Sequence, residues 1–186
     1  MIPAVYGRLL TASFIRDVLP TVHGVSTPPT AWARQVAECS RRIESTLGFA
    51  SSVRAVTEVA LLPLVELLGL TVVGRADSES ASIVQMTADG RYGLSAITAS
   101  WGEPLERIWR SSVIGAIDAD ARWCFCCNGQ ALRLIDTRRT WSRDYLEFDL
   151  LLLGRELEAQ ALLWAIAHKG AFSMQPALLD TAVTLS

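Results

Sequence analysis

The sequence predicts an α/β protein in which helices flank a central mixed sheet, preceded by an N-terminal helical extension. Segments with helical spacing of apolar residues enclose a middle part made of strand-like segments. An Asp-Gly pair and an Asn-Gly pair each join two of these segments as a hairpin. Residues 122–127 are apolar on both faces, which is typical of a central strand with a layer on each side. Together these observations favour an α/β/α sandwich.

The length of 186 residues and the hydrophobic share of 51% suit one domain with a small extension. We expect a helical lead-in over residues 1–50, an α/β domain over 51–172, and, over 173–186, the start of a helix that continues into a longer parent protein. No segment is apolar for long enough to predict a membrane span, and the first residues lack the features of a signal peptide. The sequence therefore predicts a cytoplasmic protein with no membrane partner.

Two helices are predicted before the first strand. Residues 1–29 are weakly patterned, and we expect them to be helical or irregular. Apolar residues at helical spacing then predict helices over 30–47 and 53–68. Pro63 lies inside the second helix, and because proline has no backbone N–H, we expect a kink or a restart near Leu61.

The next part of the chain is predicted to be a strand followed by a hairpin. Residues 71–73 are rich in β-branched side chains, and the strand-like segments 82–87 and 92–99 flank Asp89 and Gly90. An Asp-Gly pair in this setting indicates a type I′ turn, which requires positive φ at both residues. The remaining elements are predicted in this order: a helix from residue 102 with one apolar face that extends to Ile117, a hairpin of strands 122–127 and 131–136, a polar loop, a short strand over 145–150, and helices over 156–168 and 176–184.

Cysteine spacing gives no sign of a metal site. Cys124 and Cys127 make one C-x-x-C pair, but a zinc site needs a second pair of ligands, and none is spaced to supply it. We expect Cys124, Cys126 and Cys127 to be reduced thiols buried in a strand. No metal and no cofactor is expected.

The formal net charge of −2 argues against a protein that binds nucleic acid with its whole surface. Lys169 is the single lysine among 17 basic residues, and arginine is the better fork for phosphate. Several arginines and a tryptophan cluster around the second hairpin and its loop, and they form a candidate site for the DNA backbone: Arg133, Arg138, Arg139, Trp141 and Arg143. The alternative is a solvated loop that Asp136 and Asp144 partly neutralise.

A nuclease of the PD-(D/E)XK type needs carboxylates to hold Mg²⁺ and a nearby lysine. In that fold the first acid lies on the first strand of the central hairpin, and a Glu-x-Lys motif lies on the partner strand. The first position falls near Ser82 here, and the partner strand, 94–99, carries no charge. Lys169 lies far downstream, so the sequence predicts no active nuclease of this type.

Two segments nevertheless resemble the N-terminal region of type IIG/IIL-like restriction–modification proteins, which are fused nuclease and adenine-methyltransferase polypeptides. The segments are ADGRYGLSAITASWGEPL and WCFCCNGQALRLIDTRRTWSRDYLEFDL. The similarity covers about residues 52–170, and its most specific parts are residues 128–139 and 145–150. It implies a restriction-endonuclease-like fold, association with DNA, and a place in front of a downstream methyltransferase domain in a restriction–modification or phage-defence protein.

The sequence departs from this family where cleavage would occur. Ser82 stands where the family has its first Asp, and Ile97 and Ala99 stand where it has Glu and Lys. Methyl transfer is excluded for this chain as well, because it has no Asn-Pro-Pro-Tyr/Phe tetrapeptide and no glycine-rich strand–turn–helix. The resemblance therefore implies a degenerate endonuclease-like domain that contacts DNA or acts as a scaffold.

Two other functions remain open. An active Mg²⁺-dependent endonuclease could use relocated acids, for which the candidates are Glu58, Asp77, Glu79 and Glu103. A packing or oligomerisation module without DNA binding could instead dock on the rest of a parent protein. Its interface would include Trp32, Trp164 and the last helix.

Overall fold

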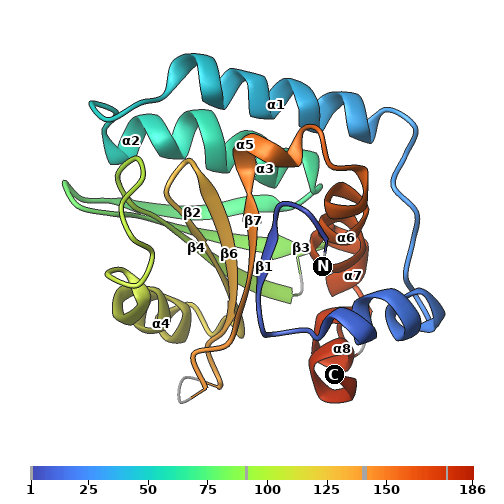
Figure 1. Ribbon diagram of the computed structural model, residues 1–186. Coiled ribbons are helices and arrows are strands. Elements are labelled where there is room, and N and C mark those ends of the chain that lie inside the picture. The colour runs from blue at the N-terminus through green and yellow to red at the C-terminus, as the bar shows by residue number, and fades with distance from the viewer. Residues whose placement is uncertain (1, 91, 140–141, 175) are drawn as a thin grey trace.

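Seven strands form one mixed sheet at the centre of the molecule (Figure 1). The structure is a computed structural model that describes residues 2–90, 92–139, 142–174 and 176–186. Strands β4 and β5 run parallel, and the other neighbouring strands are antiparallel. In sheet order the strands are β1 (Val5–Gly7), β7 (Tyr145–Asp149), β6 (Ala131–Asp136), β5 (Trp123–Cys127), β4 (Tyr92–Thr98), β3 (Ser82–Ala88) and β2 (Thr71–Asp77).

Helices pack on both faces of this sheet. Most of them share one large core with one face, and α4 covers a second, smaller core on the other face. Figure 1 shows α1, α2 and α3 above the sheet and α4 at the lower left. The predicted α/β fold with a mixed sheet flanked by helices is confirmed. The helices are η1 (Phe14–Val18), η2 (Leu19–Thr21), α1 (Trp32–Thr46), α2 (Val53–Val56), η3 (Thr57–Leu61), α3 (Leu62–Leu67), α4 (Trp109–Asp118), α5 (Leu150–Leu153), α6 (Leu157–Ala167), α7 (Lys169–Phe172) and α8 (Leu178–Leu185).

The second predicted helix is divided into three pieces, in keeping with the restart that Pro63 predicts. It starts as α2, where the Ser52 hydroxyl accepts a hydrogen bond from the backbone N–H of Ala55 at 3.3 Å. It then widens into the π-helical turn η3 and restarts as α3, with Pro63 at its second position. Proline has no backbone N–H and cannot donate the hydrogen bond that a helix interior needs. The first turn of a helix does not need that donor, so a restart just before Pro63 accommodates it.

Two turns fix the middle of the sheet. Asp89 and Gly90 have positive φ values, 51° and 68°, as the predicted type I′ turn requires, but the ladder ends at the Ala88–Tyr92 pair, one residue further along than a two-residue turn would give. In the β5–β6 hairpin, the side-chain oxygen of Asn128 accepts hydrogen bonds from the backbone N–H groups of Gln130 and Ala131 at 3.0 and 2.7 Å. The Asn-Gly signal therefore predicts the hairpin correctly, and the asparagine side chain builds the turn.

The helix predicted from residue 102 starts later than expected. Residues 101–102 and 105–108 form turns, and α4 starts at Trp109. Tertiary hydrogen bonds hold these turns, because the Gly102 N–H donates to the Asn128 carbonyl at 3.0 Å and the Asn128 amide donates to the Glu103 carbonyl at 2.9 Å. Ile117, which the sequence pattern assigns to the apolar face, is 64% exposed.

The first residues also differ from the expected helical or irregular lead-in. Residues 5–7 form the edge strand β1, which pairs antiparallel with β7. Phe14 and Trp32 from the lead-in are buried in the same core as the sheet and the later helices. Leu178, Leu179, Ala182 and Val183 of α8 join this core too. Trp32 and the last helix, two candidates for a docking interface, are thus covered by the chain itself.

Candidate functional site

The three positions that correspond to a nuclease triplet do not lie on one face of the sheet. Ser82 pairs with Thr98 across the β3–β4 ladder, and Ile83 pairs with Ile97. Paired residues share a face and consecutive residues alternate, so Ser82 points to the face opposite Ile97 and Ala99. All three side chains are buried. The three positions that the resemblance assigns to the triplet are therefore core positions on opposite faces of the sheet.

Neither face of β4 offers catalytic groups from Leu94 onward. On the side of Ser82 it carries Ala96 and Thr98, and on the other side Ser95 and Ile97. Within the part of the chain that the structure describes, the Thr98 and Ser95 hydroxyls are buried without a hydrogen-bond partner. This stretch of β4 therefore has no carboxylate or ammonium group to hold a metal ion and a hydroxide.

Two of the proposed relocated acids do come together, but an arginine lies between them. The guanidinium of Arg75 binds Glu58 through Nη1 and Asp77 through Nε, the latter at 2.7 Å. The Ser82 hydroxyl donates to the same Asp77 oxygen at 2.6 Å. These bonds, that from Arg75 above all, lower the pKa of Asp77, and the Asp77 and Glu58 carboxylates raise the pKa of Arg75.

This cluster is already neutralised by a cation of the chain itself. Its ion pairs join Arg75 to Glu58 and Asp77, and over the described ranges they include neither Glu79 nor Glu103. Among the described residues, no three His, Cys, Asp or Glu side chains gather as ligands for a metal ion. The arrangement is that of an ion-pair cluster at the edge of the sheet.

Arg133 lies inside the molecule. Its guanidinium binds Glu147 at 2.7 Å and Glu106 at 2.9 Å, and it lies 3.9 Å from the centre of the Tyr145 ring. Burial lowers the pKa of Arg133, but the bonds to the two carboxylates outweigh this effect and raise it overall. Arg133 is only 6% exposed, so its proposed role as a DNA contact does not fit its place in the fold.

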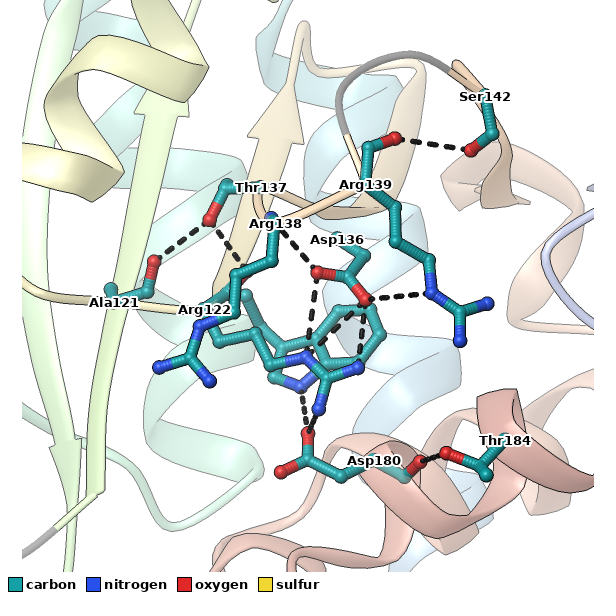
Figure 2. A network of polar contacts seen from close by, with 10 residues as sticks. Ala121, Arg122, Asp136, Thr137, Arg138, Arg139, Ser142, Asp180 and Thr184 are labelled. Atoms are coloured by element: carbon teal, nitrogen blue, oxygen red, sulfur yellow. Dashed lines mark hydrogen bonds and ion pairs between the residues drawn. The ribbon is translucent and has the colours of Figure 1, made fainter.

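The arginine loop, residues 137–144 between β6 and β7, is anchored by a buried carboxylate at its base (Figure 2). Asp136 is 2% exposed and accepts a hydrogen bond from Nη2 of Arg122 at 2.8 Å. Its other carboxylate oxygen accepts from the backbone N–H of Arg138 at 3.0 Å. Arg122 also binds Asp180 of α8 at 3.0 Å, so the C-terminal helix supports the same network.

Further hydrogen bonds order the loop on both sides of residues 140 and 141. The Thr137 hydroxyl lies within 2.9 Å of the Ala121 carbonyl and 2.8 Å of the Arg122 carbonyl. On the far side, the Ser142 backbone N–H donates to the Arg139 carbonyl at 3.2 Å. Trp141, the predicted stacking residue, lies outside the described residues.

The outward side of the loop carries the exposed arginines. Arg138, Arg139 and Arg143 are exposed, and the two guanidinium groups of Arg138 and Arg139 point in opposite directions in Figure 2. Arg139 lies 3.9 Å from the Asp136 carboxylate. The structure adds Arg8, which follows β1, is 85% exposed, and lies 3.8 Å from Asp144. No sequence signal pointed to Arg8, because it reaches the loop only through the β1–β7 pairing.

The cysteines of β5 are buried and free. Burial raises the pKa of the Cys127 thiol to about 12, so it stays protonated. Cys126 donates to the Ser112 hydroxyl at 3.2 Å on the α4 side of the sheet. These contacts fit the predicted role of the cysteines as small core side chains.

No family model, curated protein or solved structure matches this chain. Its class is therefore defined by its fold, a mixed sheet with helices on both faces and an arginine-bearing hairpin loop at one end. In the described part of the chain, no helix has both the length and the apolar character needed to cross a membrane.

Proposed function

We propose that this chain is a nuclease-like domain without cleavage chemistry, which binds the DNA backbone through its arginine loop. Its place would be at the front of a restriction–modification or phage-defence methyltransferase. The observation that carries the proposal is that Arg138, Arg139 and Arg143 are exposed on one anchored loop, with Arg8 beside it at 3.8 Å from Asp144.

The chemistry of this surface suits phosphate. Arginine presents several donors in a planar fork, which fits phosphate oxygens. Within the described residues, the guanidinium groups of Arg138 and Arg143 form no ion pair. The acid at the base of the loop, Asp136, is buried and bound to Arg122 at 2.8 Å, whereas the outward Arg139 lies 3.9 Å from it.

The overall charge limits binding to this region. A formal net charge of −2 gives no general attraction to DNA, and a local cluster must supply it. Contacts to phosphates position a protein on a duplex but carry no sequence information. We therefore expect weak binding that does not depend on sequence.

The absence of cleavage follows from two features. The β3–β4 hairpin carries no charged group from Leu94 to Ala99. The relocated acids that do come together, Glu58 and Asp77, are held by Arg75, whose positive charge disfavours Mg²⁺ at that point. Supercoiled plasmid incubated with Mg²⁺ should stay intact; nicking that disappears in Glu58→Gln or Asp77→Asn would overturn this part of the proposal.

Binding is tested by fluorescence anisotropy of a short labelled duplex at two or more salt concentrations. The double variant Arg138→Ala/Arg139→Ala should bind more weakly, and the slope of log affinity against log salt should fall by about 0.9 for each phosphate that the variant no longer neutralises. The matched control is Arg41→Ala/Arg42→Ala, an adjacent and exposed arginine pair on α1. It should bind as the unchanged protein does.

Weaker binding by both double variants would mean that net charge, and not the loop, governs affinity. No binding at low salt by the unchanged protein would refute the DNA-contacting role and favour a scaffolding module instead.

A further inference from the structure

Ser26 and His168 form a hydrogen-bonded pair on the side of the molecule where the N-terminal segment crosses α6. Ser26 lies between η2 and α1, and His168 follows the last residue of α6. The serine Oγ and the histidine Nε2 are 3.2 Å apart. The other ring nitrogen, Nδ1, is 2.6 Å from the backbone carbonyl oxygen of Trp164.

The partners of this pair determine where its protons lie. A carbonyl oxygen can only accept, so Nδ1 of His168 carries the ring proton and donates it to Trp164. The indole N–H of Trp164 can only donate, and it donates to the Ser26 Oγ at 3.0 Å. The hydroxyl proton of Ser26 is therefore left to point at the Nε2 lone pair. Burial lowers the pKa of His168, which keeps the ring neutral and able to accept that proton.

The ring of His168 is held in place on two sides. Trp164 stacks on it with a centroid distance of 4.6 Å and an interplanar angle of 11°. Gly170 lies against Nε2, and a Cβ atom at this position would come within 2.6 Å of it. The glycine thus leaves the space that the ring occupies beside Ser26.

Ser26 also lines a cavity of about 430 Å³, a volume within the range of small-molecule sites. The lining is largely apolar and comes from the N-terminal segment and α6; it includes Ile15, Leu19, Val25, Leu162 and Ala165. Among the described residues, the backbone N–H groups of Ser26 and Thr27 donate no hydrogen bond to the backbone.

We propose that Ser26 and His168 are the nucleophile and general base of an esterase-type site, whose cavity takes the acyl chain of a small ester of a hydrophobic acid. A hydroxyl 3.2 Å from the imidazole nitrogen that accepts its proton, with the opposite nitrogen fixed by a third group, is the arrangement that serine nucleophiles use. The site is separate from the arginine loop, so this activity does not depend on DNA binding.

The reaction has two balanced halves. Ser26 Oγ attacks the ester carbonyl carbon while its proton passes to Nε2 of His168, and the C–O bond to the alcohol then breaks as the alcohol takes up that proton. In the second half, water attacks the acyl-serine, gives a proton to Nε2, and releases the acid as this proton returns to Ser26. The sum is ester plus water to acid plus alcohol.

The test uses two reagents. One is a fluorophosphonate probe, from whose phosphorus the serine oxygen displaces fluoride, and the other is a nitrophenyl ester of a short fatty acid. Intact-mass and peptide-mass measurements on the full chain should find one adduct per molecule, on Ser26. Ser26→Ala should abolish both labelling and ester hydrolysis. Ser111→Ala, which changes an exposed serine on α4, should leave both unchanged.

His168→Gln keeps a hydrogen-bonding side chain but cannot act as the same base. Labelling of Ser26 should slow by about 100-fold in this variant, the lower end of what a general base contributes. Circular dichroism establishes that each variant is folded. No adduct on Ser26 in the unchanged, folded protein would refute the proposal, as would an equal labelling rate in His168→Gln.

Discussion

At the scale of single residues, Asp136 shows how a side chain that looks like surface charge can be part of the framework. In the sequence it stands beside two arginines, as one of two acids that could neutralise a solvated loop. In the structure it is buried and bound to Arg122 and to the backbone of Arg138, whereas Asp144 is partly exposed. A residue-by-residue pattern does not distinguish the two acids, since burial depends on α8 closing over Arg122.

We predict that Asp136→Asn lowers the free energy of unfolding by about 3 kcal/mol, because it removes the negative charge of the buried carboxylate that binds Arg122. Chemical denaturation measures this difference. The control is Asp144→Asn, whose ion pair with Arg8 spans 3.8 Å at the surface and should change stability by less than about 0.5 kcal/mol. Equal effects of the two changes would contradict the assigned burial.

His168 gives the fold a dependence on pH. Its pKa is lowered from the ordinary value of 6.5 by burial, so the unfolded chain takes up a proton first as the pH falls through that value. Stability should therefore be full above about pH 7 and should decrease towards the lower pKa of the folded state. The side chains in contact with the ring, Trp164 and Ser26, do not titrate in this range.

The expected result is a melting temperature that falls from about pH 7.5 to about pH 5.5 in the unchanged protein and falls less in His168→Gln, as measured by calorimetry. An identical pH profile in the two proteins would show that folding leaves the pKa of His168 unchanged, and would contradict the lowered value.

At the scale of elements, the two segments on which the expected restriction–modification resemblance rests build the sheet. Asn128 forms the β5–β6 turn, and Arg133 pairs with Glu147 across β6 and β7. Asp149 accepts hydrogen bonds from two backbone N–H groups at the start of α5. The polar residues of the segments 128–139 and 145–150 thus have structural roles in turns, ion pairs and a helix cap. The exposed side chains of Arg138 and Arg139 are the ones left to bind a ligand.

Local signals predict most elements and miss those that depend on distant contacts. The turn at Asp89 and Gly90 and the restart of the helix near Pro63 follow from backbone chemistry within a few residues. The late start of α4 depends on Asn128, and the strand β1 depends on β7. The Ser26–His168 pair joins residues 142 positions apart, so no spacing rule could have found it.

The contact between α1 and α5 depends on Gly154. A Cβ atom at this position would lie 2.8 Å from the Cβ of Ser40 and 3.1 Å from the Cα of Ala37. We predict that Gly154→Ala lowers the free energy of unfolding by about 1–3 kcal/mol, since α1 would have to move away from α5.

The control for this change is Gly48→Ala, because a Cβ atom there would meet nothing within 4 Å. Its stability should be equal or slightly higher, by up to about 1 kcal/mol, as the unfolded chain loses freedom. Denaturant midpoints of the two variants provide the comparison, and a neutral Gly154→Ala would mean that the helices can separate without cost.

At the scale of the whole molecule, the N-terminal segment completes the fold. It supplies the edge strand β1, the buried side chains of Leu10 and Phe14, and one wall of the cavity. Its backbone also reaches the C-terminal helix, since the N–H of Thr11 donates to the Ser186 hydroxyl at 3.0 Å. Figure 1 shows the two chain ends on the same side of the sheet.

Removal of residues 1–12 should therefore lower the melting temperature by several degrees and promote association, because β7 would become an unprotected edge. Calorimetry and light scattering at two protein concentrations measure both effects. Tyr6→Ala, which truncates a side chain that is 48% exposed and keeps the β1–β7 ladder, should change neither. A truncated protein as stable as the full chain would contradict this role.

The pairing of β1 with β7 has a consequence for synthesis. Val5 leaves the ribosome well before its partner Phe148, which is made only after the other strands of the sheet. Until then the apolar side chains near Leu10 and Phe14 have no surface to pack on. The N-terminal segment must therefore stay unpaired until β7 has been synthesised. A chaperone that binds short apolar segments would be most useful to this protein before that point.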